Sequence, residues 1–404
     1  MRVTVAYQDG RLELDVPEDR LGGAGGGPSG LPSGEVRGRV VAALEDPADY
    51  PPLLRALVPG DRVVVPFDPD LPAAADVLGG LCEVLIRGGI EPGAITLLGR
   101  PGPGIDGLPD GVAVVAHDPA DKPQLAYLAT TSGGRRIYLN RLVVDADVVV
   151  PVGLLAYDAF LGYRGPWQAL FPGASDAEAR RDLLRLGDDP AEVPSPDRPN
   201  ASLVESAEVS WLLGSQFQVG IVPGATGLAR VIAGLDEAVK REGSRAVDDA
   251  WRLTVESRAE LVVAGVGVDG RPTGLDTLAE ALAAATMAVR PGGKIAILSR
   301  AAGPIGPALG RLIEVGDPRR GLSALKGRRD DEDYADARRI AAALASADVY
   351  LLSDLNPDLV DDLGMIPLGK AEEVRRLVAA STDCIALSRA ELTRVDVKDD
   401  RPDD

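Results

Sequence analysis

The sequence predicts an α/β protein with two domains, each built on a mostly parallel, Rossmann-like sheet, with a cleft between them. Short apolar runs rich in β-branched residues alternate with amphipathic helical stretches along most of the 404 residues. Hydrophobic residues make up 45% of the chain, which is enough to build packed cores of that size. We place the domains at residues 1–252 and 253–395, followed by an acidic tail at 396–404.

The N-terminal half begins with a predicted hairpin, Val3–Val5 with Leu12–Leu14, turning at Asp9-Gly10. The segment Leu21–Gly34 has seven glycines in fourteen residues, and we predict that it is mobile because it has little apolar surface to bury. Strands are then predicted at Arg62–Val65, Ala94–Leu98, Val112–Ala116, Arg136–Leu139 and Val143–Pro151, and helices at Val36–Leu44, Pro72–Arg87 and Asp176–Leu186.

The C-terminal half contains a second αβ series. Before it, two strands at Gln216–Val222 and Ala229–Ala233 are predicted to pair, and Asp236–Trp251 is predicted as a long helix. The series has predicted strands at Glu260–Val266, Lys294–Ser299, Val349–Leu352 and Cys384–Leu387, and helices at Leu275–Val289, Gly306–Ile313, Ala335–Ala345 and Ala371–Ala380. Cys82 and Cys384 lie on apolar faces far apart in the sequence, which indicates buried thiols without a disulfide.

Composition excludes several classes of function. A net charge of −19 repels a phosphate backbone, so nucleic acid is not an expected partner. No apolar run reaches the length of a membrane span and no signal peptide is visible, so we expect a cytoplasmic protein without a membrane partner. An unrelated Rossmann dehydrogenase is disfavoured, because the glycines at Gly303–Gly306 lack the required spacing. The sequence leaves the oligomeric state open.

Polar or glycine-rich loops follow several of the predicted strands. Asp68, the loop Arg100–Gly104, His117 and the loop Leu154–Asp158 all stand at such strand ends. Ligands of parallel sheets bind beyond the carboxyl ends of the strands, so we expect one shared site there. His117 is the only histidine in the chain, and the following stretch Tyr157–Gly173 gathers Tyr, Trp, Phe and Arg in a protein with only 4% aromatic residues.

Several motifs in this region resemble one known family. They are VVVPFDPDLP (Val63–Pro72), AHDPADKPQLAYLATTSGGRRIYLNRLVVDADVVVPVG (Ala116–Gly153), YDAFLGYRGPWQALFPG (Tyr157–Gly173) and SDLNPDLVDDLGMIP (Ser353–Pro367). In this order they resemble the nickel-pincer-nucleotide lactate racemases. The resemblance implies an isomerase, a racemase or epimerase for small hydroxy acids. It also implies a nicotinate-derived mononucleotide that holds nickel and is attached to a lysine, two histidines as general bases, and an arginine and a lysine that hold the substrate carboxylate.

Residue by residue, the resemblance is incomplete in the aromatic loop. His117 stands where the family has one catalytic histidine, whereas Asp158 replaces the other. Tyr163 and Gly165 match the family pattern, but Arg164 and Trp167 replace its serine and arginine. Gln168 occupies the place of the lysine that carries the cofactor. A primary amide is not a nucleophile of that kind, so no covalent tether is expected here, and which cofactor binds stays unknown.

The substrate-holding cations are also replaced. Asp68 matches the family pattern, with Asp70 beside it, but Leu71 stands in place of the arginine. Thr277 and Glu280 align with the family's glutamine and lysine. The resemblance also implies a histidine that binds the nickel, and Leu184 lies near its expected position. A carboxylate substrate would therefore face Asp68, Asp70, Asp158 and Glu280, and like charges about 4 Å apart repel by roughly 4 kcal/mol at an effective dielectric near 20. We expect standard lactate racemisation to be lost or altered.

Less specific interpretations stay open for each residue. His117 can be a structural histidine, Asp158 an N-cap or a solvated acid, and Trp167 and Gln168 packing residues of the loop. Asp68 and Asp70 can form an acidic turn or hold a divalent cation. For function, the alternative to an altered isomerase is a non-catalytic homologue that binds a ligand or a partner. In either case we expect a small molecule in the interdomain cleft, where His117, Asp68 and Asp158 converge.

Overall fold

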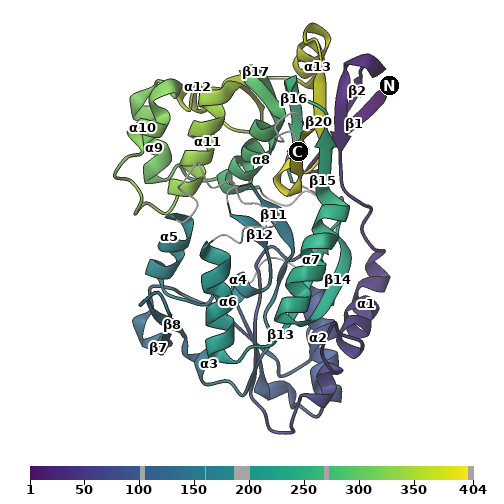
Figure 1. Cartoon of the computed structure of the whole chain (residues 1–404), viewed down its shortest axis with the longest axis vertical. Helices are drawn as coiled ribbons and strands as arrows, with labels where there is room; N and C mark the ends of the chain where they lie inside the picture. The colour runs from purple at the N-terminus through teal and green to yellow at the C-terminus, as the bar shows by residue number, and fades with distance from the viewer. Residues whose placement is uncertain (101–104, 160, 186–200, 268–272, 399–404) are drawn as a thin grey trace. The chain divides into compact units, whose positions relative to one another are not determined.

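The computed structural model describes residues 1–100, 105–159, 161–185, 201–267 and 273–398 (Figure 1). The chain forms two compact units, each made of segments that are separated in the sequence. We call the first the terminal unit (Met1–Pro28, Tyr157–Phe160 and Asp248–Asp404) and the second the middle unit (Ser29–Ala156 and Leu161–Val247). Parallel sheets with helices confirm the predicted α/β class. No helix within the described ranges has both the length and the apolar character of a membrane span.

The middle unit is built on a four-stranded parallel sheet with the order β6-β5-β4-β9. Its strands are β4 (Val63–Pro66), β5 (Ile95–Leu98), β6 (Ala113–Val115) and β9 (Val148–Val149). A three-stranded sheet contains β10 (Val152–Leu154), β13 (Phe217–Pro223) and β14 (Leu228–Leu235), and β7 (Leu125–Thr130) pairs with β8 (Arg136–Asn140). Two short strands, β11 (Ala156–Asp158) and β12 (Gly162–Arg164), belong to the aromatic loop.

Several helices belong to the middle unit, and the last of them continues into the terminal unit. They are α1 (Ser33–Glu45), α2 (Ala74–Arg87), α3 (Arg141–Val144), α4 (Trp167–Leu170), α5 (Ala177–Arg185), α6 (Ala201–Leu213) and α7 (Asp236–Trp251). Short 3₁₀ turns occupy Leu53–Arg55, Pro92–Ala94 and Lys122–Gln124. Alternate side chains of β4 face opposite cores, as the two-residue period of a strand requires. Val63 and Val65 pack with α1 and α2, whereas Val64 packs with residues of β8, α4, α5 and α6.

The terminal unit is built on a six-stranded sheet with the order β19-β18-β17-β16-β20-β3, in which every pairing is parallel. The strands are β3 (Leu21–Gly25), β16 (Ala259–Gly265), β17 (Val289–Leu298), β18 (Ala347–Leu352), β19 (Ile366–Leu368) and β20 (Cys384–Leu387). The helices are α8 (Leu275–Ala288), α9 (Pro307–Val315), α10 (Gly321–Ala324), α11 (Tyr334–Ser346), α12 (Pro357–Asp362) and α13 (Ala371–Ala380), with 3₁₀ turns at Glu18–Arg20, Pro318–Arg320 and Ala390–Leu392.

Two apolar layers lie on the two faces of this sheet. Val262, Ile295 and Val349 face the core formed with α8, α9 and α11. Val263 and Ala296 face the other core, formed with α13 and the hairpin of β1 (Arg2–Tyr7) and β2 (Gly10–Asp15). This three-layer arrangement explains why the strands read as nearly continuous apolar runs, since both faces of a parallel sheet are buried.

The N-terminal hairpin is confirmed, with its turn one residue earlier than predicted. Tyr7 pairs with Gly10, so Gln8 and Asp9 form the loop, and Gln8 has a φ of 45°. A Cβ atom on Gly10 would lie 2.6 Å from the ring of Tyr7. A side chain at this position would therefore displace the tyrosine ring, which lies across the glycine.

The prediction that Leu21–Gly34 is mobile is wrong for its first part. Residues 21–25 form the edge strand β3, which pairs with β20. A Cβ atom on Gly23 would lie 2.9 Å from Val255, and one on Gly27 would lie 2.3 Å from Trp251. The glycines allow the strand to lie close against β15 (Arg252–Val255) and Trp251, so their packing partners, and not their own side chains, order the segment.

Three further expectations need correction. Arg136–Leu139 is a strand, but it pairs antiparallel with β7 and does not join the parallel sheet. Part of Val143–Pro151 is the helix α3, which begins after the capping residue Asn140. Strand β21 (Arg394–Val397), which pairs with β15, had no sequence signal that we recognised, and it includes the first two residues of the predicted tail. The buried, free thiols of Cys82 and Cys384 are confirmed.

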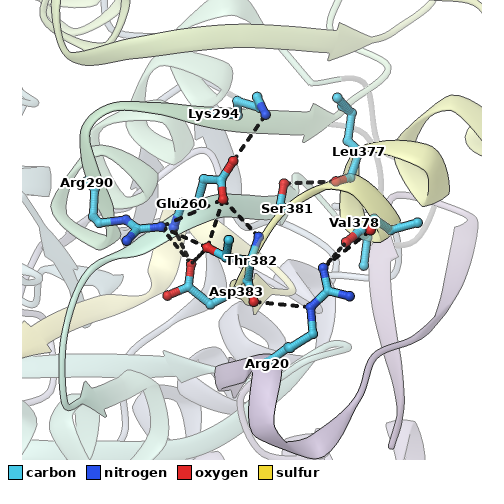
Figure 2. A network of polar contacts seen from close by, with 10 residues as sticks. Arg20, Glu260, Arg290, Lys294, Leu377, Val378, Ser381, Thr382 and Asp383 are labelled. Carbon is cyan, nitrogen blue, oxygen red and sulfur yellow. Dashed lines mark hydrogen bonds and ion pairs between the residues drawn. The ribbon is translucent and has the colours of Figure 1, made fainter.

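A polar network on the surface of the terminal unit joins β16, β17 and the segment before β20 (Figure 2). Glu260 accepts hydrogen bonds of 2.8 Å from both the backbone and the hydroxyl of Thr382, and Lys294 lies 3.3 Å away. Arg290 pairs with Asp383 at 3.0 Å. The two hydrogen bonds from Thr382, and to a smaller extent Lys294, lower the pKa of Glu260 to about 2. The network contributes to the stability of the charged carboxylate.

Candidate functional site

His117 follows β6, two residues beyond the end of the strand, and both of its ring nitrogens have partners in the middle unit. Nε2 lies 2.8 Å from the carbonyl oxygen of Ser175, and Nδ1 lies 3.1 Å from Nδ2 of Asn140. Ser175 stands beside β8, because it forms an antiparallel bridge with Leu139. The imidazole is thus held between two segments that are themselves hydrogen-bonded together.

The orientation of Asn140 fixes the tautomer of His117. The Oδ1 atom of Asn140 caps α3 by accepting a hydrogen bond of 3.0 Å from the backbone N–H of Leu142. Its amide nitrogen must then point to His117, and an NH₂ group can only donate. Nδ1 is therefore the acceptor, and the proton is on Nε2, which donates to the carbonyl of Ser175. Asn140 is only 1% exposed, so its amide has little contact with water.

This environment disfavours the imidazolium form. Burial is the largest cause and lowers the pKa of His117, and the charge of Arg180 lowers it further. The hydrogen bond to Ser175 and the charge of Asp118 act in the opposite direction but are smaller. A neutral imidazole whose basic nitrogen already accepts a hydrogen bond would have to break the bond to Asn140 before it could take a proton from a substrate.

Asp68 and its neighbours form a turn at the carboxyl end of β4. The backbone N–H of Asp68 donates to Val152, and its carboxylate accepts 3.0 Å from the N–H of Asp70. This is the local hydrogen bond typical of an acidic turn. Leu71, which the family resemblance predicts to replace an arginine, is 1% exposed and packs in the core with α1 and α2. The side chain at this position is a core residue.

The loop residues around Trp167 pack tightly. Tyr163 and Trp167 are buried, and a Cβ atom on Gly165 would lie 2.1 Å from the indole ring of Trp167. Lys240 lies 5.5 Å from the centre of that ring and pairs with Asp236 at 2.6 Å. Gln168 lies in α4, where its backbone bonds to Gly165 and Gly173. Arg164 is partly buried in β12.

Asp158 belongs to the terminal unit, where it forms a buried ion pair. Its Oδ2 atom accepts a hydrogen bond of 2.8 Å from Nη2 of Arg339, and the two side chains are 3% and 6% exposed. Arg339 lies on α11 and also bonds to Asp336 at 3.3 Å. A buried charge requires a partner of opposite sign. Asp158 and Arg339 are such partners for each other. The carboxylate of Asp158 is an acceptor in a structural ion pair.

Glu280 and Thr277 lie three residues apart on α8, also in the terminal unit. Burial lowers the pKa of Arg339, but the charges of Asp158, Glu280 and Asp336 raise it more. Thr277 bonds to the carboxylate of Asp276 through its backbone N–H at 2.8 Å. Asp336 is crowded by acids: burial is the main cause that raises its pKa to about 6, with smaller contributions from Asp276 and Asp333. We call Asp158, Glu280, Asp336 and Arg339 the Arg339 cluster.

The structure brings some of the predicted site residues together and separates others. Asp68 and His117 follow strands of one parallel sheet, with β5 between their strands. Asp158 does not follow a strand of that sheet, because it lies at the end of β11 and packs in the terminal unit, which corrects the expectation of one common sheet. Asp158 and Glu280 share Arg339. The convergence of Asp158 with His117 and Asp68 stays a prediction. Of the loop Arg100–Gly104, residues 101–104 are outside the described residues, as is the side chain of Leu184.

Sequence reasoning missed Asn140 and Arg339. A signal for Asn140 existed, because asparagine before an apolar run is a common N-cap, but the run was interpreted as a strand. Arg339 had a weaker signal, an arginine three residues after Asp336 among the alanines of a predicted helix. Its partner Asp158 is 181 residues away in the sequence, so no local pattern reveals the pair.

Within the described part of the chain, no three or more His, Cys, Asp or Glu side chains are arranged as a metal site.

Comparison with known proteins gives three results. Residues 106–182 match the lactate racemase N-terminal domain. A lactate racemase from Thermoanaerobacterium thermosaccharolyticum is 22% identical, over 92% of this chain and 93% of that protein. Its apoprotein structure covers 98% of this chain with a TM-score of 0.81 at 19% identity, and a protein from Thermotoga maritima covers 92% with a TM-score of 0.65 at 15% identity. The resemblance to the lactate racemase family is confirmed.

Proposed function

We propose that this protein is a divergent lactate-racemase-type protein in which standard nickel-pincer lactate racemisation is lost or altered. The observation that carries the proposal is the state of His117. The only imidazole of the chain uses Nε2 to bind Ser175 and Nδ1 to bind Asn140. Racemisation at a hydroxy carbon requires that hydrogen, as a proton or a hydride, is removed from one face of the substrate and returned on the other. Two free groups are therefore required, one on each face. The cytoplasmic location expected from the sequence stays part of this proposal.

The second position supports the same conclusion. Asp158 stands where the family has its other catalytic histidine, and its carboxylate is paired with Arg339 at 2.8 Å. Breaking that pair would leave a buried guanidinium without its closest partner, which is strongly unfavourable. A general base must be free to accept a proton from the substrate. Neither of the two positions offers such a group in this arrangement.

The residues of this chain do not fit the nickel-pincer nucleotide as the family holds it. Position 168 provides an amide in place of an amine, and Lys240, the amine beside Trp167, is ion-paired with Asp236. A protonated lysine is a poor nucleophile. Imidazole is a preferred nickel ligand, and the single imidazole present has both nitrogens engaged. We therefore assign no step of a reaction to this cofactor.

The alternative function is a non-catalytic homologue that binds a ligand or a partner. The Arg339 cluster favours the non-catalytic function over a new isomerase, because its three acids stabilise one buried arginine and so have a structural role. Such a cluster holds the helices α8 and α11 and the segment with Asp158 in one arrangement. An altered isomerase would instead need a free acid or base in the same place.

The proposal is tested by producing the chain together with the enzymes that synthesise the pincer nucleotide. Intact mass, bound nickel and interconversion of D- and L-lactate are then measured, with a lactate racemase treated in the same way as the positive control. We expect an unmodified mass, no stoichiometric nickel and no racemisation. Replacing Gln168→Lys alone should not restore activity, because the base and the substrate-holding cations would still be absent.

Two outcomes would overturn the proposal. One is a mass increase equal to the pincer nucleotide, and the other is lactate turnover that His117→Ala abolishes. Asn140→Ala provides the matched control for the second outcome. If His117 is a base that only rests against Asn140, this variant should retain or increase turnover, whereas His117→Ala should lose it.

A further inference from the structure

A cavity of about 560 Å³ opens in the middle unit, on the face of the parallel sheet that carries Val64, Thr96 and Val115. Its other wall is formed by the 3₁₀ turn Lys122–Gln124 and the short helix α3. Small-molecule sites usually enclose roughly 300–1,000 Å³, so this cavity is large enough for a ligand well above the size of a small hydroxy acid.

The cavity is distinct from the turn at Asp68. It adjoins Arg62 and Gly93, which stand at the amino ends of β4 and β5, whereas Asp68 follows the carboxyl end of β4. The lining is mainly apolar, with side chains such as Val64, Val115 and Leu142. A ligand that fills this space must therefore have an apolar body.

Three charged side chains, Arg62, Arg141 and Asp145, line the cavity. Arg62 is engaged by Asp147 through two hydrogen bonds. Arg141 differs, because its guanidinium donates only one long hydrogen bond of 3.4 Å, to the carbonyl of Leu125. Most of its donors are available for an anion.

Three uncharged polar residues, Thr96, Gln124 and Asn140, also line the cavity. Thr96 and Gln124 both face the cavity, and neither side chain forms a hydrogen bond within the described part of the chain. A few convergent polar groups in a mostly apolar cavity are the usual composition of a ligand site. We propose that this cavity binds an organic acid with an apolar body, whose carboxylate pairs with Arg141. The proposal is independent of whether the protein racemises lactate.

The imidazole of His117 can report on ligand binding in the cavity. Asn140 lines it, and the amide of Asn140 donates to Nδ1 of His117. Because His117 is the only histidine, its imidazole gives a single set of NMR signals that respond to changes at Asn140. Titration with octanoate as the probe should shift these signals to saturation, and calorimetry gives the affinity independently. We expect 1-octanol, which has the same apolar body without the charge, to bind more weakly.

Variants separate the two parts of the site. Arg141→Gln should weaken octanoate binding by about tenfold and leave 1-octanol unchanged, because it removes only the charge-assisted contact. Arg136→Gln is the matched control, an exposed arginine of β8 outside the cavity, and should change neither affinity. Gly93→Phe should abolish binding of both probes. A Cβ atom on Gly93 would meet no atom within 4 Å, so the backbone has room for a larger residue at this position in the cavity lining.

The proposal is overturned if octanoate gives no saturable binding to the natural chain. It is equally overturned if Arg141→Gln and Arg136→Gln bind octanoate with the same affinity, or if Gly93→Phe, with an unchanged melting temperature, still binds it. Each of these results would mean that the cavity does not select an anion with an apolar body.

Discussion

The resemblance to the lactate racemases aligns His117 and Asp158 with the two catalytic histidines of that family, and the surroundings of the two residues differ. At the first position the imidazole is retained but is engaged by uncharged partners, the carbonyl of Ser175 and the amide of Asn140. At the second, a carboxylate replaces the imidazole and is buried against Arg339. Both side chains are therefore engaged by neighbouring protein groups. The comparison teaches that a residue type retained at a catalytic position does not establish a catalytic group.

The energetic consequences at the two positions are unequal. Neutral hydrogen bonds each contribute about 1 kcal/mol net, whereas removing one partner of a buried ion pair costs several times as much. The Arg339 cluster should therefore be far more sensitive to substitution than the surroundings of His117.

The largest effect is expected for Arg339→Ala, which leaves the buried carboxylate of Asp158 without its cation. We expect a loss of about 3–5 kcal/mol in the free energy of unfolding at pH 7, measured by chemical denaturation. The double variant Arg339→Ala with Asp158→Asn should recover part of that loss, because the unpaired charge is then absent. Arg376→Ala on α13, an exposed arginine, is the control. Equal effects of Arg339→Ala and Arg376→Ala would contradict the importance of the buried pair.

A smaller effect of opposite sign is expected for Asp336→Asn. Burial raises the pKa of Asp336 from 3.8 to about 6, and that value already includes the attraction of Arg339. The folded protein therefore binds this proton more tightly than the unfolded chain, and stability decreases as the pH rises from about 4 to about 6. At pH 7 Asp336→Asn should be more stable than the natural chain by roughly 2 kcal/mol. An unchanged or steeper decrease of stability between pH 4 and 6 in the variant would refute this assignment.

The smallest effect is expected in the network of Figure 2, because Glu260 and Lys294 are 26% and 28% exposed, whereas Asp158 and Arg339 are 3% and 6% exposed. Hydrogen bonds from Thr382 lower the pKa of Glu260 from 4.5 to about 2. The stabilisation is present above pH 4.5 and is lost as the pH falls towards 2. Glu260→Gln should cost about 1 kcal/mol at pH 7, because solvent screens the site, and nothing near pH 2. If Glu260→Gln lost as much free energy of unfolding as Arg339→Ala, the expected difference between buried and exposed charges would be contradicted.

Periodicity was enough to predict most elements of the fold. The helix at Asp236–Trp251 and the strand at Cys384–Leu387 have the predicted bounds, because their apolar spacing and their ends are local properties. The error at Leu21–Gly34 arose because the partners that order β3, such as Val255, are far away in the sequence. A glycine-rich strand has no side-chain pattern of its own to reveal it.

The candidate site was less predictable than the fold, for the same reason. The sequence identified His117 and Asp158 as the residues to consider, since one is the sole histidine and the other stands in the aromatic loop. It could not indicate that Asn140 would fix the imidazole or that Arg339 would neutralise Asp158. Whether a polar group is free depends on its partners in the tertiary structure, and local sequence patterns do not reveal those partners.

The central claim is that His117 is a neutral imidazole with its proton on Nε2, and it can be measured directly. In ¹⁵N-labelled protein the single histidine should show a protonated Nε2 and an unprotonated Nδ1 at pH 7, with a titration midpoint below 6.5. Asn140→Asp should raise the pKa of His117, because a carboxylate beside Nδ1 favours the imidazolium. A proton on Nδ1, or a midpoint above 6.5 in the natural chain, would contradict the claim and return His117 to the position of an available base.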